Sequence, residues 1–168
     1  MTAIASNTRW RAMLTAGLAA CAVGALGALL TDLDSWYYGL KVPPWKPPDW
    51  LFGPAWTLIF ALAAISGYLC WMRGPRYSAE KARILALFTV NGLLNTAWSA
   101  LFFQIHRLDW ALVEVGLLWL SIAGLMVLTA RSSRLASLLL LPYLAWVSFA
   151  GMLNFALLRL NGPTGTGL

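Results

Sequence analysis

The sequence is dominated by five long runs of apolar residues that almost no charge interrupts. They cover residues 12–31, 50–72, 84–106, 110–130 and 135–158. A helix needs about 20 apolar residues to cross the hydrocarbon core of a bilayer, and each run is long enough for one crossing. The runs lack alternating polar residues and are about twice as long as a strand of a membrane barrel. The sequence therefore predicts an all-α integral membrane protein, a single-domain bundle of five transmembrane helices.

The composition excludes the usual soluble classes. Hydrophobic residues make up 60% of the 168 residues and charged residues 11%, against about 25% charged in a typical soluble domain. A soluble fold of this size leaves about a third of its chain surface exposed and could not hide so much apolar surface. The net charge of +6 comes from basic residues that flank the apolar runs. We therefore expect a lipid bilayer, and no nucleic acid, as the partner of these charges.

The basic residues also predict an orientation. Four basic residues follow the first, third or fifth apolar run and therefore lie on one side of the membrane. Eight belong to the other side: Arg9, Arg11, Arg73, Arg76, Lys81, Arg83, Arg131 and Arg134. By the positive-inside rule, the N-terminus is cytoplasmic and the C-terminus external if the protein resides in a bacterial inner membrane.

The first connection, residues 32–49, contains four prolines and several aromatic residues. Proline fixes the backbone and removes a hydrogen-bond donor, which predicts a stiff loop. Loops of more than about a dozen residues are usually functional or disordered, and the aromatic content argues against disorder. We expect this external loop to act as the lid of a pocket, and we expect the tail, residues 161–168, to be flexible.

Few residues within the spans could carry acid–base chemistry. Glu114 is the one acid inside an apolar run, and His106, the one histidine, ends the third run. With no further ligand candidates near His106, we expect no metal site. The spans contain no set of residues typical of a hydrolase or an ATP-driven pump. Glu114 could pair with Arg107 or act as the coupling acid of a transporter, and both interpretations stay open.

Tryptophans and amides are the more informative residues. Many of the ten tryptophans fall near span ends, as expected of an interfacial belt. The helical rise places Trp56 and Trp98 about 9 and 12 Å below the external face, and Trp146 and Asn95 near the midplane. Asn91, Asn95 and Ser99 share one helix face. These groups indicate either hydrogen bonding between helices or a cavity for a large, flat, mostly apolar ligand.

Four segments of the sequence resemble the TspO/MBR family of tryptophan-rich sensory proteins and translocator proteins. In order, they are WYYGLKVPPWKPPDWLFGPAWTLIF, LLNTAWSALFF, WALVEVGLLW and LPYLAWVSFAGMLNFALLRLN. The resemblance runs from Trp36 to Asn161. It implies a five-helix bundle, often a homodimer, whose pocket is closed by the first loop. The family binds porphyrins and synthetic isoquinoline and benzodiazepine-type ligands, and its animal members bind cholesterol.

Carried over by position, the resemblance implies a set of ligand-binding residues: Tyr37, Trp56, Asn95, Trp98, Trp110, Trp146, Ala150 and Asn154. Trp56 and Trp146 match tryptophans implicated in light-dependent porphyrin breakdown by bacterial members. Phe155 stands where the sterol motif has a tyrosine, so the resemblance implies poor sterol recognition by that element.

These observations leave three hypotheses for function. The first is a membrane receptor for porphyrins, with protoporphyrin IX or heme as ligand and no obligatory cofactor, that acts in stress sensing or in porphyrin transport or disposal. The second is an enzyme that degrades porphyrin with light and oxygen through Trp56 and Trp146. The third is a small multidrug or solute transporter that uses Glu114.

Overall fold

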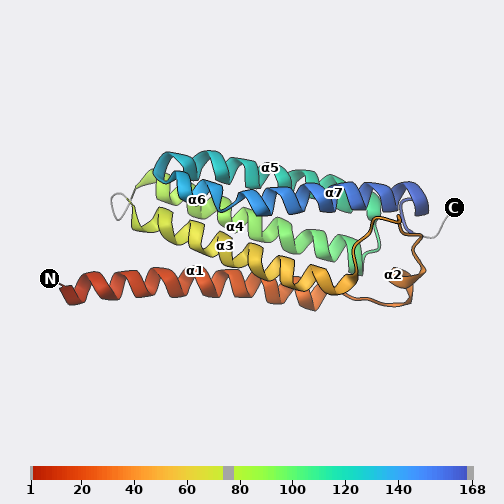
Figure 1. Ribbon diagram of the computed structural model, residues 1–168, viewed down its shortest axis with the longest axis horizontal. Coiled ribbons are helices and arrows are strands. Elements are labelled where there is room, and N and C mark those ends of the chain that lie inside the picture. Colours follow the sequence, from red (N-terminus) through yellow and green to blue (C-terminus); the bar gives the residue numbers. More distant parts are fainter. Residues whose placement is uncertain (1, 74–77, 166–168) are drawn as a thin grey trace.

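The computed structural model describes residues 2–73 and 78–165, and within them five long helices run side by side (Figure 1). These helices are α1 (Thr2–Leu30), α3 (Phe52–Met72), α4 (Ala79–Ser99), α5 (Leu108–Ser132) and α7 (Leu141–Asn161). Two short helices, α2 (Ser35–Gly39) and α6 (Arg134–Leu138), a 3₁₀ turn (Asp49–Leu51) and a π turn (Ala100–Gln104) complete the described elements. The α1–α3 connection, residues 31–51, lies at the same end of the bundle as the end of α7, and we call this the loop end.

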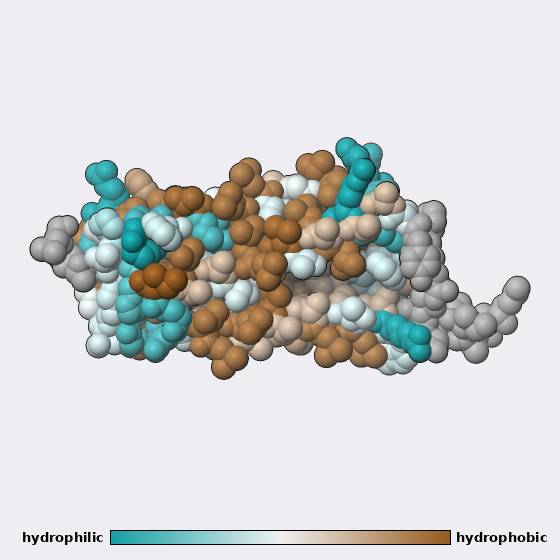
Figure 2. Space-filling model, turned by 180° about the vertical axis from the view of Figure 1, so that it is seen from behind, coloured by the Kyte–Doolittle hydropathy of each residue, from teal (hydrophilic) through white to brown (hydrophobic). Residues whose placement is uncertain are grey.

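The predicted membrane bundle is confirmed. The described residues contain five helical segments that are long and apolar enough to cross a membrane. Brown apolar side chains occupy the middle of the face in Figure 2, and hydrophilic teal side chains gather toward its two ends. This distribution matches a bilayer core between two polar interfaces, so the chain is a multi-pass integral membrane protein. Of the basic residues used to predict the orientation, Arg76 lies outside the described residues.

Local chemistry explains where helices begin. α4 begins at Ala79, earlier than the predicted residue 84, because Ser78 accepts a hydrogen bond from the Lys81 backbone N–H at 3.2 Å and caps the helix. The fifth predicted span is interrupted after α6, and α7 begins with Pro142 in its first turn. Proline is tolerated there because the first N–H groups of a helix have no partner within the helix. The backbone between α6 and α7 is thus a break inside the fifth predicted run.

A second proline, Pro54, follows the same rule. Pro54 lies in the first turn of α3. Pro54 therefore removes no hydrogen bond from the helix interior.

Helix α5 packs against α4 and α7. Its inward face is closed by apolar residues that include Leu108, Ala111, Ile122 and Leu125, all with no exposed surface. Helix α1 lies at the edge and packs mainly against α3. Gly24 allows this approach, because a Cβ there would lie only 3.3 Å from the Phe60 ring. The other four spans therefore form the core of the bundle, and α1 lines one side of the cavity described below.

Candidate functional site

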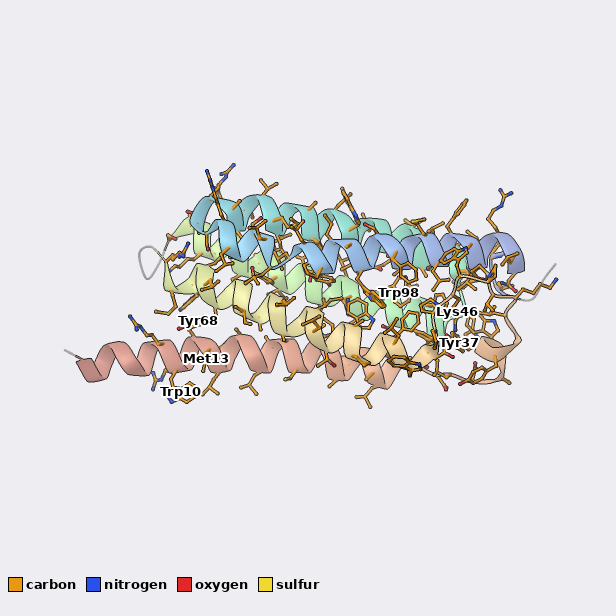
Figure 3. The ribbon with its side chains drawn as sticks, in the orientation of Figure 1. Trp10, Met13, Tyr37, Lys46, Tyr68 and Trp98 are labelled. Atoms are coloured by element: carbon orange, nitrogen blue, oxygen red, sulfur yellow. The ribbon has the colours of Figure 1, made fainter. Side chains whose placement is uncertain are left out.

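A cavity of about 490 Å³ lies at the loop end, enclosed by α1, α3, α4, α7 and the α1–α3 connection. Seven of the eight predicted ligand-binding residues line it: Tyr37, Trp56, Asn95, Trp98, Trp146, Ala150 and Asn154. Figure 3 shows Trp98 within the bundle, with Tyr37 and Lys46 nearer the loop end. The helices thus bring together residues that are more than a hundred positions apart in the chain.

The structure places the eighth predicted residue, Trp110, away from this cavity. Trp110 is 57% exposed, and the Arg107 guanidinium lies 4.8 Å from the centre of its ring. The reason is its helix: α5 contributes no residue to the cavity lining, because α4 and α7 lie between it and the cavity. Glu114 lies on the same helix and also stays outside the lining.

Glu114 is buried, and neither of its carboxylate oxygens has a hydrogen-bond partner among the described residues. The sequence left open a pairing with Arg107. Arg107 instead binds Asp109 through two hydrogen bonds of 2.8 and 2.6 Å.

Aromatic rings form much of the cavity wall. Trp98 stacks on Phe102, with ring centres 5.1 Å apart, and Trp56 stacks on Phe60 at 5.3 Å. Phe52 packs edge-on against Trp146 at 5.5 Å. Such walls suit a flat apolar ligand, because aromatic rings pair favourably in stacked and edge-to-face arrangements.

The π turn adds two aromatic residues that the sequence analysis missed. Phe102 and Phe103 are neighbours in the chain, yet both line the cavity. Successive side chains of an α-helix point about 100° apart. Here the Ile105 N–H bonds to the Ala100 carbonyl, five residues back, at 3.0 Å, and this wider turn changes the directions of the side chains. Such π turns occur frequently at functional sites, but apolar periodicity gave no signal for this one.

A small charged cluster stands at the loop end of the cavity. The Tyr37 hydroxyl donates to Asp49 at 2.7 Å, and the Lys46 ammonium pairs with the same carboxylate. The ammonium also lies 5.4 Å from the centre of the Tyr37 ring. Burial raises the pKa of Tyr37 above its ordinary value, and the neighbouring Asp49 raises it further. The sequence analysis proposed Tyr37 as a site residue but did not identify its contact with Asp49.

The α1–α3 connection is anchored to the end of α7. The Asn161 side chain accepts from the Lys41 N–H at 2.7 Å and donates to the Lys41 carbonyl at 2.8 Å. The Trp36 indole N–H donates to the Thr164 carbonyl at 2.9 Å, and its ring stacks on His106 with centres 4.0 Å apart. Asn161 and Thr164 thus contact the α1–α3 connection, while residues 166–168 lie outside the described residues. The flexibility of the tail stays a prediction.

An amide also joins three helices beneath the cavity. Asn154 of α7 accepts from the Trp98 indole of α4 at 3.2 Å and donates to the Leu108 carbonyl of α5 at 2.8 Å. Asn154 is 1% exposed. Each polar atom of the Asn154 amide thus makes a hydrogen bond within the protein, and the bond to its oxygen holds the Trp98 indole in the cavity wall.

Comparisons with known proteins agree with this architecture. A family model described as the TspO/MBR family matches residues 16–160. The tryptophan-rich protein TspO of Chlorobaculum tepidum is 43% identical, over 83% of this chain and 89% of its own length. Protein CrtK of Rhodobacter capsulatus is 41% identical, over 84% and 87% of the two chains. The translocator protein of Bos taurus is 36% identical over 86% of both chains.

The matched residues include the second half of α1, the other four spans almost completely, and every cavity residue named above. The chain therefore belongs to the TspO/MBR family.

Proposed function

We propose that this protein is a membrane receptor that binds porphyrins and similar flat apolar ligands in the cavity at the loop end. The observation that carries the proposal is the meeting of Trp56, Trp98 and Trp146 around one cavity of about 490 Å³. This volume falls within the range of about 300–1,000 Å³ typical of small-molecule sites. Binding there would serve stress sensing or porphyrin transport or disposal.

The charged cluster supports a ligand that carries acidic groups as well as an apolar body. Lys46 lines the cavity and is paired with Asp49. A porphyrin propionate could replace Asp49 as the partner of Lys46, since ammonium–carboxylate hydrogen bonds are among the strong ones in proteins. The macrocycle would then lie between the aromatic walls, with its propionates toward the loop end.

The test is quenching of tryptophan fluorescence by protoporphyrin IX, in the dark, with the detergent-purified protein. We expect saturable quenching that is lost or much weakened in the Trp56→Phe/Trp146→Phe double variant. The matched control is Trp110→Phe/Trp119→Phe, which removes two tryptophans that do not line the cavity and should leave the affinity unchanged. Quenching that does not saturate, or that is equal in both double variants, would overturn the proposal.

The same samples separate binding from degradation. Trp56 and Trp146 both line the cavity, and a porphyrin bound there would itself absorb light. A porphyrin spectrum that changes under illumination in the native protein, but not in the dark or in the first double variant, would extend the proposal to light-dependent breakdown. Identical spectra in light and dark would limit the function to binding.

A further inference from the structure

Four buried polar side chains form a continuous row of hydrogen bonds from α5 to the cavity. Asn91 Nδ2 bonds to Ser121 Oγ at 2.8 Å, Tyr143 Oη to Asn91 Oδ1 at 3.1 Å, and Asn95 Nδ2 to Tyr143 Oη at 3.2 Å. All four side chains are buried, and Asn95 alone among them lines the cavity. The row therefore connects a residue of the core to the surface that a ligand would touch.

Ser121 sets the direction of the whole row. Its Oγ lies 2.7 Å from the Leu118 carbonyl oxygen, and two oxygens at that distance need a hydrogen between them. A carbonyl has no hydrogen, so the Ser121 hydroxyl donates to it and accepts from the Asn91 amide nitrogen. The Asn91 oxygen must then accept from Tyr143, and the Tyr143 oxygen must accept from the Asn95 nitrogen.

This direction leaves the carbonyl oxygen of Asn95 without a partner among the described residues. Several other polar groups of the lining use a hydrogen within the protein, whereas the buried indole N–H of Trp146 has no partner among the described residues. The donors and their acceptors are Thr31 to Gly27, Thr57 to Gly53, Trp98 to Asn154, and Asn154 to Leu108. The Ser99 hydroxyl can donate or accept and does not discriminate between ligands. The cavity thus offers a ligand an amide oxygen whose orientation is fixed from the core.

We propose that the row makes Asn95 a hydrogen-bond acceptor that selects flat apolar ligands with an N–H or O–H group on the inserted edge. Ser121, Asn91 and Tyr143 are the positioning residues that hold Asn95 in this state. The inference rests on the proposed binding of flat ligands in the cavity and adds to it a chemical class. Protoporphyrin IX, inserted with its propionates toward the loop end, has no N–H or O–H on the inserted edge, so Asn95 discriminates among other flat ligands. It predicts that Ser121, which does not line the cavity, controls selectivity.

Carbazole and dibenzofuran provide a matched pair of probes. They share one flat tricyclic shape, and carbazole has an N–H where dibenzofuran has an ether oxygen. Their affinities are measured by equilibrium dialysis of the detergent-purified protein, with empty micelles as the reference for partitioning. We expect carbazole to bind roughly three- to tenfold more tightly than dibenzofuran, the range that one neutral hydrogen bond provides.

Variants locate the source of the preference. In Asn95→Leu, and in Ser121→Ala, the affinity ratio should fall toward one, because the acceptor or the group that orients it is lost. Ser121→Thr keeps the hydroxyl and should restore the native ratio. Thr89→Val removes a hydroxyl that bonds to its own helix at 3.0 Å and lies outside the cavity lining, so it should leave the ratio unchanged. A ratio of affinities is insensitive to a general loss of folded protein, which affects both probes equally.

The outcomes distinguish this inference from the proposed function. A native ratio of one or less, or a native ratio that persists in Asn95→Leu, overturns the acceptor role of Asn95. Persistence in Ser121→Ala overturns the orienting role of the row. If protoporphyrin IX binds saturably while carbazole shows no preference, only this inference fails. If none of the three probes binds saturably, the proposed function fails as well.

Discussion

At the scale of single residues, the ionisation of Tyr37 makes the stability of the loop end depend on pH. Burial, and then the adjacent Asp49, raise the pKa of its hydroxyl above the ordinary value of about 10. A raised pKa in the folded state means that the contribution of Tyr37 to stability is fully present below about pH 10 and is lost as the pH rises further. The measurement is the tyrosinate absorbance of the native protein minus that of Tyr37→Phe. This difference reports the Tyr37 phenol, which should ionise at a higher pH than free tyrosine. A titration midpoint at the ordinary value would contradict the prediction.

Some site residues could be predicted individually and others could not. Trp56, Trp98 and Asn95 were found from their depth along a helix, since an indole or amide inside a membrane faces protein or a cavity. Trp110 was assigned to the site by the resemblance alone, and it does not line the cavity. Neither resemblance nor depth specifies which helices lie between a residue and the cavity. Phe102 and Phe103 gave no signal, because phenylalanine is as common facing lipid as facing a cavity.

At the scale of elements, the contact between Asn161 and the α1–α3 connection is open to test. Asn161→Ala removes both hydrogen bonds to the Lys41 backbone, so the connection should open more often. We expect chymotrypsin to cleave faster after the exposed residues Tyr38 and Trp45, by roughly the factor of 5–30 that corresponds to one or two kcal/mol. The readout is the rate of fragment appearance from detergent-purified protein.

Lys41→Ala is the matched control, because Asn161 binds the backbone of residue 41 and not its side chain. Its cleavage rate should equal that of the native protein. Equal rates in the native protein and Asn161→Ala would mean that the Trp36 contacts alone hold the connection closed.

The elements themselves were largely predictable. Run length and charge located the five spans, because the bilayer requires a fixed apolar length, whereas the break before α7 falls inside the fifth predicted run. The contacts of the tail were missed because its partners, Trp36 and Lys41, lie more than a hundred positions away. The composition of a segment carries no information on contacts over such separations.

At the scale of the whole molecule, the distribution of charge predicts the topology. The side with the N-terminus carries eight basic residues and the opposite side four, so we expect the loop end to be external in a bacterial inner membrane. A periplasm-dependent reporter such as alkaline phosphatase should be active when fused after Leu168 and inactive when fused after Ser132, between the fourth and fifth spans. The reverse pattern would contradict the predicted orientation.

The anchoring of the α1–α3 connection by the end of α7 has a consequence for biosynthesis. Trp36 and Lys41 leave the ribosome long before Asn161 and Thr164, the residues that hold them. Until α7 has been translated, the α1–α3 connection lacks these hydrogen-bond partners, and the cavity lacks the residues that α7 contributes to its lining. A chain that ends before Asn161 would therefore lack both contacts, and its α1–α3 connection would not be held over the cavity.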